Sequence, residues 1–269
     1  MPNDSDRAAD LYLELLKGTL LGTIYPNMDG FYWPHSYPMR WLLRKIFPSD
    51  VVFFRRMPSE LRGHAWPAYA YSMVGPKRLD NIRFCLEDVI KKNVQGDFVE
   101  TGVWRGGACI FARAVLKARG VTDRNVWVAD SFEGLPKPDA EKYPEDKGDK
   151  HHFIPELAVS LEQVQANFRI FGLLDNQVKF MKGWFKDTLP TAPFEKLAVA
   201  RLDGDIYEST MDALKSLYPK VSVGGYLIVD DYEAVPACKQ AIHDYRNQHG
   251  IKDPIKAIDS SGIFWQKSV

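Results

Sequence analysis

From residue 96 onward, short apolar segments alternate with amphipathic ones, and this alternation constrains the fold more than any other feature of the sequence. The candidate strands are 97–101, 126–130, 178–182, 197–202 and 225–229, and helical patterns cover 107–119, 157–171, 209–217 and 236–249. Short, mainly apolar strands that alternate with helices predict a parallel sheet covered on both faces.

The end of the chain predicts a different connection. Segments 255–258 and 263–266 flank the turn-forming run Asp-Ser-Ser-Gly, which indicates a hairpin. An α/β sheet that is parallel except for a closing antiparallel hairpin strand resembles the class I methyltransferase architecture, which is a Rossmann-like fold. This resemblance concerns the fold alone.

The first 94 residues have another character. A helical pattern at 11–21 is followed by an aromatic, proline-rich stretch at 24–71 and by a second helical pattern at 77–92. Long stretches without regular structure usually have a task, such as covering a binding site. We interpret residues 1–94 as a helical, aromatic-rich extension that serves as a lid and an oligomer contact, and residues 95–269 as the domain that carries the chemistry.

Charge and cysteine content exclude several classes of partner. Lys plus Arg and Asp plus Glu both number 35, so no overall field attracts nucleic acid or an anionic membrane. The N-terminus lacks the basic and apolar regions of a signal peptide, and no apolar run approaches the roughly 20 residues of a membrane helix. Cys85, Cys109 and Cys238 lack CxxC spacing, which favours buried free thiols in a reducing compartment. We therefore expect a soluble, cytoplasmic protein.

A glycine-rich turn follows the first strand of the alternating region. The run Asp97-Phe-Val-Glu-Thr-Gly-Val-Trp-Arg-Gly-Gly places Gly102, Gly106 and Gly107 where a ligand can approach the backbone ahead of a helix. A dinucleotide site would carry GxGxxG here, with the pyrophosphate on the helix N-terminus. The sequence has Glu100 instead, whose charge repels pyrophosphate and attracts a cationic amino group and a sulfonium. The pattern therefore favours S-adenosylmethionine over NAD.

Two further strand ends belong to the expected donor pocket. Asp130 ends the second strand, where a carboxylate can accept hydrogen bonds from both ribose hydroxyls or can cap the following helix. Gly183 and Trp184 follow the third strand, and Trp184 either contacts adenine or fills the core. The residues expected from these stretches to bind the donor are Glu100, Gly102, Trp104, Gly106, Asp130, Ser131, Gly183 and Trp184.

Carboxylates follow two neighbouring strands. Asp203 and Asp205 come after the fourth strand, with Glu208 nearby, and Asp230 and Asp231 end the fifth. In a parallel sheet both sets fall on one edge, where uncompensated clustering of like charges is costly. A hard divalent cation resolves this cost, and oxygen ligands favour Mg²⁺, or Mn²⁺ and Ca²⁺, over Zn²⁺. The aspartates can also be solvated turn and cap residues.

A cation beside a methyl donor predicts a mechanism. The cation would bind two adjacent substrate oxygens, orient them and lower the pKa of the reacting hydroxyl. A sugar hydroxyl is a poor nucleophile near neutral pH, so such activation fits a sugar substrate. We expect Asp205 to take the proton beside a cation held by Asp203, or the two residues to exchange these roles.

Four stretches together resemble the macrocin O-methyltransferase family, which methylates deoxysugars on macrolide and related antibiotics. They are YSMVGPKRLDNI, DFVETGVWRGG, VADSFEGLPKP and RLDGDIYESTMDALKSLYPKVSVGGYLIVDDY. The resemblance implies a dimer or higher oligomer and an S-adenosylmethionine-dependent catalytic domain at 95–269. It also implies that the metal ligands are Asp203, Asp230 and Asp231 and that Asp205 is the base. Ser72 and Met73 are implied to close over the donor. A more distant similarity is to metal-dependent catechol O-methyltransferases.

A lid is expected from the aromatic stretch or from segment 136–153. In that segment His151 and His152 either contact substrate or are exposed loop histidines. The aromatic stretch differs from the family pattern, and its side chains either bind an apolar aglycone or a sugar ring, or pack a dimer interface; they are Phe31, Tyr32, Trp33 and His35.

Three alternatives to sugar methylation remain. The first is methylation of a catechol or another vicinal diol with the same donor and cation. The second is an NAD-dependent oxidoreductase, against which Glu100 and the missing GxGxxG argue. The third is a non-catalytic cofactor-binding or scaffold protein, against which the complete set of carboxylates argues.

Overall fold

A seven-stranded sheet organises the molecule in the computed structural model, which describes residues 4–24, 30–31, 54–55 and 69–269. Its strands are β3 (Asp97–Thr101), β4 (Val126–Asp130), β5 (Val178–Lys182), β6 (Leu197–Leu202), β7 (Val221–Val229), β8 (Lys256–Ala257) and β9 (Ile263–Gln266). The order is β5-β4-β3-β6-β7-β9-β8. Strands β3 to β7 pair in parallel, and β9 pairs antiparallel with both β7 and β8. The predicted parallel sheet with a closing antiparallel hairpin is confirmed.

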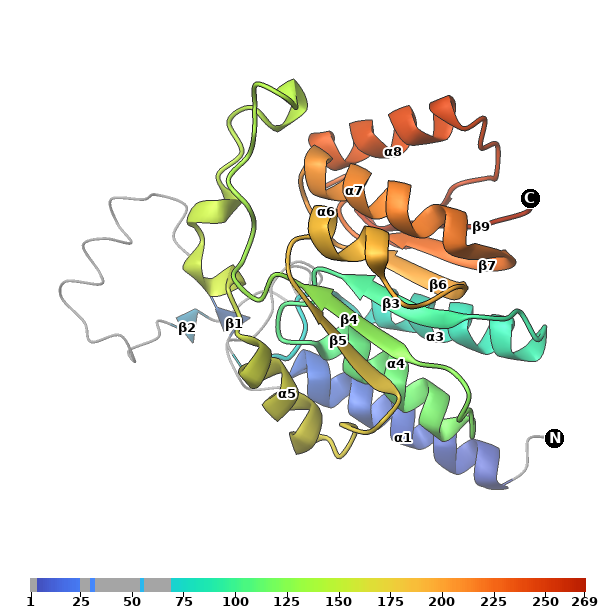
Figure 1. Ribbon diagram of the computed structural model, residues 1–269. Coiled ribbons are helices and arrows are strands. Elements are labelled where there is room, and N and C mark those ends of the chain that lie inside the picture. Colours follow the sequence, from blue (N-terminus) through green and yellow to red (C-terminus); the bar gives the residue numbers. More distant parts are fainter. Residues whose placement is uncertain (1–3, 25–29, 32–53, 56–68) are drawn as a thin grey trace.

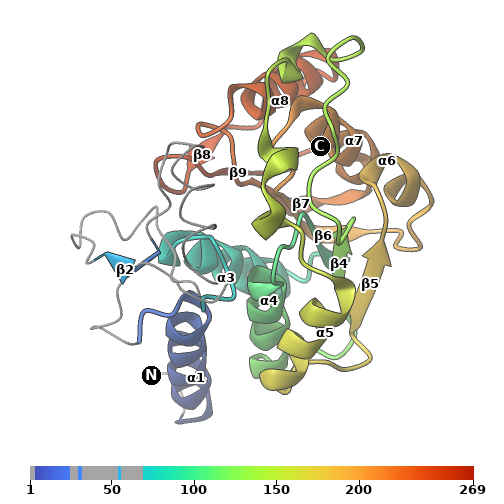
Figure 2. The same cartoon turned by 90° about the vertical axis from the view of Figure 1, so that its left-hand side faces the viewer.

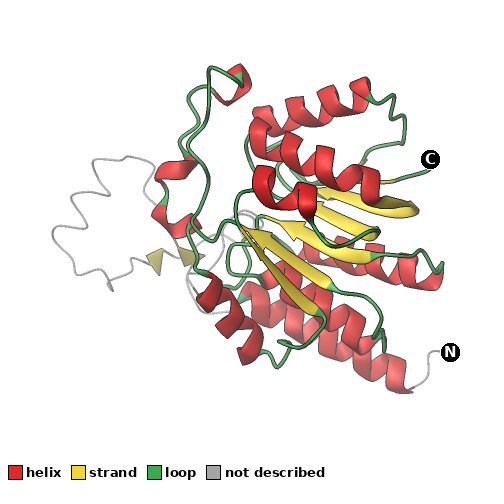
Figure 3. Ribbon diagram, in the orientation of Figure 1, coloured by secondary structure: helices red, strands yellow, loops and turns green. Residues whose placement is uncertain are grey.

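Helices cover both faces of the sheet (Figures 1 and 3). One face carries α1 (Asp4–Leu21), α3 (Pro76–Lys91), α4 (Gly107–Ala118) and α5 (Leu161–Ile170). The other carries α6 (Phe185–Thr188), α7 (Tyr207–Leu217) and α8 (Pro236–Gln248), with the short turns η5 (Leu189–Thr191) and η6 (Tyr218–Lys220). Apart from the sheet, β1 (Gly30–Phe31) and β2 (Phe54–Arg55) form a two-residue antiparallel pair.

The first two helices of the described chain share a hydrophobic core with the sheet. Leu13 and Leu20 of α1 and Leu86 of α3 belong to the same buried cluster as Ile110 of α4 and Phe98 of β3. The helical part of the extension is therefore built into the domain that contains the sheet. Within the described residues, no helix has the length and apolar character needed to cross a membrane.

The predictions for the aromatic stretch at 24–71 fall mostly outside the described residues. Tyr32, Trp33 and His35 lie outside the described residues, and of Phe31 the structure describes only the backbone. The lid and interface roles of that stretch therefore stay predictions.

The three cysteines are all buried and free, as the sequence predicted.

The starts of two helices, α5 and α1, differ most from the sequence prediction. Helix α5 begins at Leu161 instead of residue 157, because the Ser160 hydroxyl caps it by accepting a 3.2 Å hydrogen bond from the backbone N–H of Gln163. Helix α1 begins at Asp4 instead of residue 11. Its first turn contains Asp4 and Asp6, whose negative charges interact favourably with the positive end of the helix dipole.

Backbone hydrogen bonds extend the sheet one residue past four of its strands. The N–H of Gly102 donates to the Ala129 carbonyl at 3.0 Å, and that of Asp203 donates to the Thr101 carbonyl at 2.9 Å. Gly183 and Asp230 are bound in the same way to the neighbouring strand. We call these four residues, Gly102, Gly183, Asp203 and Asp230, the rim. The backbone of the rim is therefore held in place by the sheet, independently of any side-chain contact.

Candidate active site

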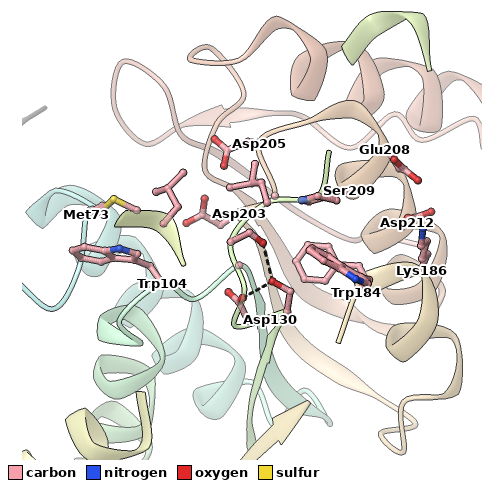
Figure 4. A pocket seen from close by; sticks show the side chains of 18 residues that line it. Met73, Trp104, Asp130, Trp184, Lys186, Asp203, Asp205, Glu208, Ser209 and Asp212 are labelled. Atoms are coloured by element: carbon pink, nitrogen blue, oxygen red, sulfur yellow. Dashed lines mark hydrogen bonds between the residues drawn. The ribbon is translucent and has the colours of Figure 1, made fainter. Parts of the chain in front are cut away.

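A pocket with an empty volume of about 770 Å³ opens at the rim (Figure 4). Of the residues predicted to bind the donor or the metal or to act as the base, those that line it are Met73, Gly102, Trp104, Asp130, Ser131, Trp184, Asp203 and Asp205. The segment after Ser131 and helices α6 and α7 complete the wall with Gly134, Leu135, Pro136, Leu157, Phe185, Lys186, Gly204, Glu208, Ser209 and Asp212. Residues predicted to bind the donor and residues of the predicted carboxylate cluster thus line the same pocket.

Gly102 brings the first and fourth strand ends into contact. Its φ of 81° lies in the left-handed region, which glycine occupies without strain. A Cβ at this position would overlap the carbonyl oxygen of Asp203. The glycine is therefore required by the close approach of two rim residues as well as by the turn itself.

The segment that precedes α3 is docked on the glycine-rich turn. The Arg105 guanidinium donates to the Ala70 carbonyl at 2.8 Å, and the Gly107 N–H donates to the Tyr71 carbonyl at 2.9 Å. Ser72 is consequently buried, and Met73 faces the pocket. The sequence resemblance placed both residues over the donor, and the structure brings Met73 into the pocket wall.

Asp130 serves the turn and still faces the pocket. Its carboxylate accepts 2.7 Å hydrogen bonds from the backbone N–H groups of Val103 and Phe132. Burial raises its pKa, and these two N–H groups oppose the increase. Asp130 also lines the pocket, where a ligand can reach it. Binding of ribose by Asp130 stays a prediction.

Glu100 lies behind the pocket instead of among its lining residues. It is 2% exposed, pairs with the guanidinium of Arg201, and accepts a hydrogen bond of 2.8 Å from the Cys109 thiol. Burial raises the pKa of Glu100 to about 7, although the charge of Arg201 opposes the increase. The guanidinium of Arg201 already compensates part of the negative charge of Glu100. Direct contact between Glu100 and the donor stays a prediction.

Three carboxylates gather where the sequence predicted a metal. One oxygen from each of Asp203, Asp205 and Asp231 lies within 4.8 Å of the other two. Burial, and then the charge of Asp203, raises the pKa of Asp205 to about 7. Burial, followed by the charges of Asp205 and Asp203, raises the pKa of Asp231 well above its ordinary value. One oxygen of Asp231 is buried and has no hydrogen-bond partner. Such a cluster favours a cation.

Asp230 is placed differently from its two predicted partners. Its carboxylate pairs with the guanidinium groups of Arg78 and Arg201, and Arg78 also donates to Asp259 at 2.8 Å. Arg201 is 1% exposed and donates to Asp203 at 2.8 Å. The structure therefore joins Asp205, and not Asp230, to Asp203 and Asp231. Metal binding by Asp230 stays a prediction.

Sequence reasoning missed the two arginines and most of the α6 and α7 contribution to the pocket. Arg201 had a visible signal, because it is the one charged residue in the otherwise apolar run Leu197–Leu202, and a buried charge requires partners. Lys186 and Asp212 had none, since polar residues on an amphipathic helix are usually solvent-exposed.

Glu100→Gln should change how stability depends on pH. Because the folded-state pKa of Glu100 is raised to about 7, folding takes up a proton between about pH 4.5 and 7. This group therefore stabilises the native chain at low pH and loses that contribution as pH rises through about 7. We expect the free energy of unfolding of the native chain to fall more between pH values of about 5.5 and 8 than that of Glu100→Gln. Urea denaturation at both pH values measures the difference, and equal slopes would contradict it.

Comparisons with known proteins agree with this geometry. Residues 9–267 match the family described as Macrocin-O-methyltransferase (TylF). The chain is 50% identical to the 8-demethyl-8-(2,3-dimethoxy-alpha-L-rhamnosyl)-tetracenomycin-C 4'-O-methyltransferase of Streptomyces olivaceus, over 97% of this chain and 94% of that protein. It is 47% identical to the mycinamicin III 3''-O-methyltransferase of Micromonospora griseorubida, over 96% and 97% of the two chains.

A solved structure supports the same assignment. The O-methyltransferase NovP superposes with a TM-score of 0.85 at 49% identity, covering 97% of this chain and all 100% of that one. The α/β fold, with a sheet that is parallel except for its closing hairpin strand, is that of a class I methyltransferase, as the sequence predicted. With a family match over nearly its whole length, this chain belongs to the macrocin O-methyltransferase family.

Proposed function

We propose that this chain transfers the methyl group of S-adenosylmethionine to a hydroxyl of a deoxysugar in a glycosylated natural product, with a bound divalent cation such as Mg²⁺. The family consists of O-methyltransferases, which implies S-adenosylmethionine as the donor. The two relatives are named for a rhamnosyl-tetracenomycin and for mycinamicin III, which supports a sugar-bearing acceptor. The observation that carries the proposal is the carboxylate group of Asp203, Asp205 and Asp231 beside a pocket lined by Gly102 and Asp130.

The residues at this position fit a hard divalent cation. They offer oxygen ligands only, and the unpartnered buried oxygen of Asp231 lacks the positive charge that would compensate its burial. We assign the cation to Asp203 and Asp231. Asp230, the third ligand expected from the sequence, would have to exchange its arginine partners for the cation. A bound cation supplies charge that favours the ionised form of the substrate hydroxyl.

The remaining chemistry falls to side chains of the chain itself. Asp205 is our candidate base, because it lines the pocket and its carboxylate lies beside those of Asp203 and Asp231, to which we assign the cation. As the substrate O–H bond breaks, the proton passes to an oxygen of Asp205. The substrate oxygen forms a bond to the donor methyl carbon while the carbon–sulfur bond breaks, leaving S-adenosylhomocysteine. The pocket wall holds the two reactants in line, which replaces a bimolecular encounter by an oriented one.

Cation and base roles should separate in point variants. We expect EDTA to abolish methyl transfer and Mg²⁺ to restore it. Asp231→Asn should weaken Mg²⁺ binding, whereas Asp205→Asn should retain it and lose about 10² to 10⁴ in kcat. Calorimetric titration with Mg²⁺ measures the first effect and steady-state kinetics the second. Asp139→Asn, an exposed change outside the carboxylate group, is the control. Full activity in EDTA would remove the cation from the proposal.

The acceptor class is tested with a panel. Rhamnosylated and other deoxysugar-bearing natural products are compared with catechols under the same donor and Mg²⁺ concentrations. Turnover of glycosides supports the proposal, and turnover of catechols alone would replace it with methylation of vicinal diols. Calorimetry with S-adenosylhomocysteine, with and without Mg²⁺, tests the donor pocket in parallel.

We also propose that the chain forms a homo-oligomer. On α1, Leu11 and Leu15 lie four residues apart and are 65% and 63% exposed, and Tyr12 beside them is 41% exposed. An apolar helix face of this kind favours burial against another surface. Light scattering coupled to size exclusion measures the assembly, and a monomer at all concentrations would refute it.

A further inference from the structure

Residues 131–160 leave the sheet between β4 and α5 and pass over its carboxyl edge (Figures 1 and 2). We call them the crossing segment. It contains the short turns η2 (Pro144–Asp146), η3 (His151–Phe153) and η4 (Pro155–Leu157). Its middle turn, η2, packs against helices α7 and α8 on the far side of the pocket. The segment thus spans from the donor half of the sheet to the half that carries the carboxylates.

A single buried side chain fastens the middle of this segment. Asp146 is 1% exposed, and its two carboxylate oxygens accept hydrogen bonds from the backbone N–H groups of Tyr207 at 2.6 Å and Glu208 at 3.0 Å. These are the first two residues of α7. The rings of Tyr143 and Tyr207 lie 5.8 Å apart and add an apolar contact at the same place.

Helix α7 depends on this distant contact for its start. Its N-cap position is Ile206, which has no side-chain cap, so unpaired N–H groups of the first turn would otherwise remain. Asp146 supplies the missing acceptors from 61 residues away. Asp205 immediately precedes Ile206 and has a φ of 55°, so the backbone that aims its carboxylate is anchored through the same first turn.

We propose that Asp146 is a positioning residue for methyl transfer, fastening the crossing segment to α7 and thereby holding the backbone of Asp205. The inference rests on the role proposed above for Asp205. Asp146 itself touches neither donor nor acceptor, since it is absent from the residues that line the pocket. Removing its carboxylate releases two structures at once, the middle of the crossing segment and the turn that carries Asp205.

The ends of the crossing segment have their own anchors. The Ser131 hydroxyl donates to the Gly134 carbonyl at 2.7 Å, and the Trp104 indole donates to the Glu156 carbonyl at 2.9 Å. The segment's contributions to the pocket wall lie at or beside these anchors; they are Ser131, Gly134, Leu135, Pro136 and Leu157. Donor binding should therefore survive the loss of Asp146, while the reaction step does not.

The test compares Asp146→Ala and Asp146→Asn with Ser160→Ala in the full chain. Ser160 caps α5 through its own hydroxyl, so this control removes a helix cap that does not fasten the crossing segment to another element. Hydrogen exchange followed by mass spectrometry is measured over 137–153 and 203–210. Binding of S-adenosylhomocysteine is measured by calorimetry, and kcat with the panel glycoside that the native chain methylates fastest.

We expect Asp146→Ala to exchange faster in both windows and to lose at least about tenfold in kcat, with donor affinity within about threefold of native. Asp146→Asn, which keeps one acceptor, should fall between, and Ser160→Ala should leave both windows and kcat unchanged. Native-like exchange over 203–210 in Asp146→Ala, or an equal loss of kcat in Ser160→Ala, overturns the proposal. If the native chain methylates no glycoside, the proposed function fails, whereas the exchange data still decide whether Asp146 holds the turn.

Discussion

Gly102→Ala should abolish methyl transfer and lower the free energy of unfolding by about 3 kcal/mol. A left-handed backbone costs an L residue roughly 1–2 kcal/mol, and overpacking adds about 1–3 kcal/mol. The added Cβ would overlap the carbonyl oxygen of Asp203, so relief requires two rim residues to move apart. Because Asp203 also belongs to the carboxylate group, that movement displaces the site as well as the turn.

Gly120→Ala is the matched control for this prediction. Gly120 has a φ of 69°, and no atom lies within 4 Å of a Cβ built on it, so its variant carries the backbone cost without the overlap. Urea denaturation gives the stabilities, and calorimetry with S-adenosylhomocysteine gives donor affinity. Equal losses of stability in the two variants would show that the contact with Asp203 is unimportant.

Arg201→Met should be the most destabilising substitution among the charged residues of the site. The guanidinium is 1% exposed and pairs with Glu100, Asp203 and Asp230. Its removal leaves Glu100 without its counter-charge and leaves Asp230 with one of its two arginine partners, and breaking buried pairs in this way costs about 3–5 kcal/mol. Lower pH should reduce the loss, because protonation of the carboxyls removes the uncompensated charge.

A second substitution distinguishes the electrostatic cause from lost packing. Adding Glu100→Gln to Arg201→Met should recover part of the stability, since the amide needs no counter-charge. Arg113→Met is the comparison, because Arg113 is also buried but its partner Asp175 has a side chain 30% exposed. Urea denaturation should show a smaller loss there. An Arg201→Met loss no larger than that of Arg113→Met would contradict the argument.

The fold was predictable because each element carries its own periodic signal. The bounds of strands β3, β4, β5, β6 and β9 agree with the sequence prediction, whereas β7 begins at Val221 instead of residue 225. The start of α5 was wrong because Ser160 stops the helix locally, a cap inside a segment that otherwise reads as helical. Local chemistry at an end is harder to foresee than the element itself.

The site was predictable only as far as topology decides it. Parallel strands bring their carboxyl ends to one edge, so Asp203, Asp205 and Asp231 could be expected together. Which carboxylate faces which charge depends on side-chain direction, and here Asp230 faces Arg78 and Arg201. The partner Arg78 comes from a helix more than a hundred residues earlier in the chain, a pairing that no local pattern encodes.

The hydrogen bonds that hold the rim carry a consequence for how such enzymes diversify. Backbone hydrogen bonds to adjacent strands hold Gly102, Asp203 and Asp230, so this edge of the pocket has the rigidity of the sheet. Exposed residues of the crossing segment, apart from its anchor Asp146, take no part in those hydrogen bonds and can accumulate substitutions without moving the rim. The acceptor that an enzyme of this kind binds can therefore change between relatives while the methyl-transfer step stays the same.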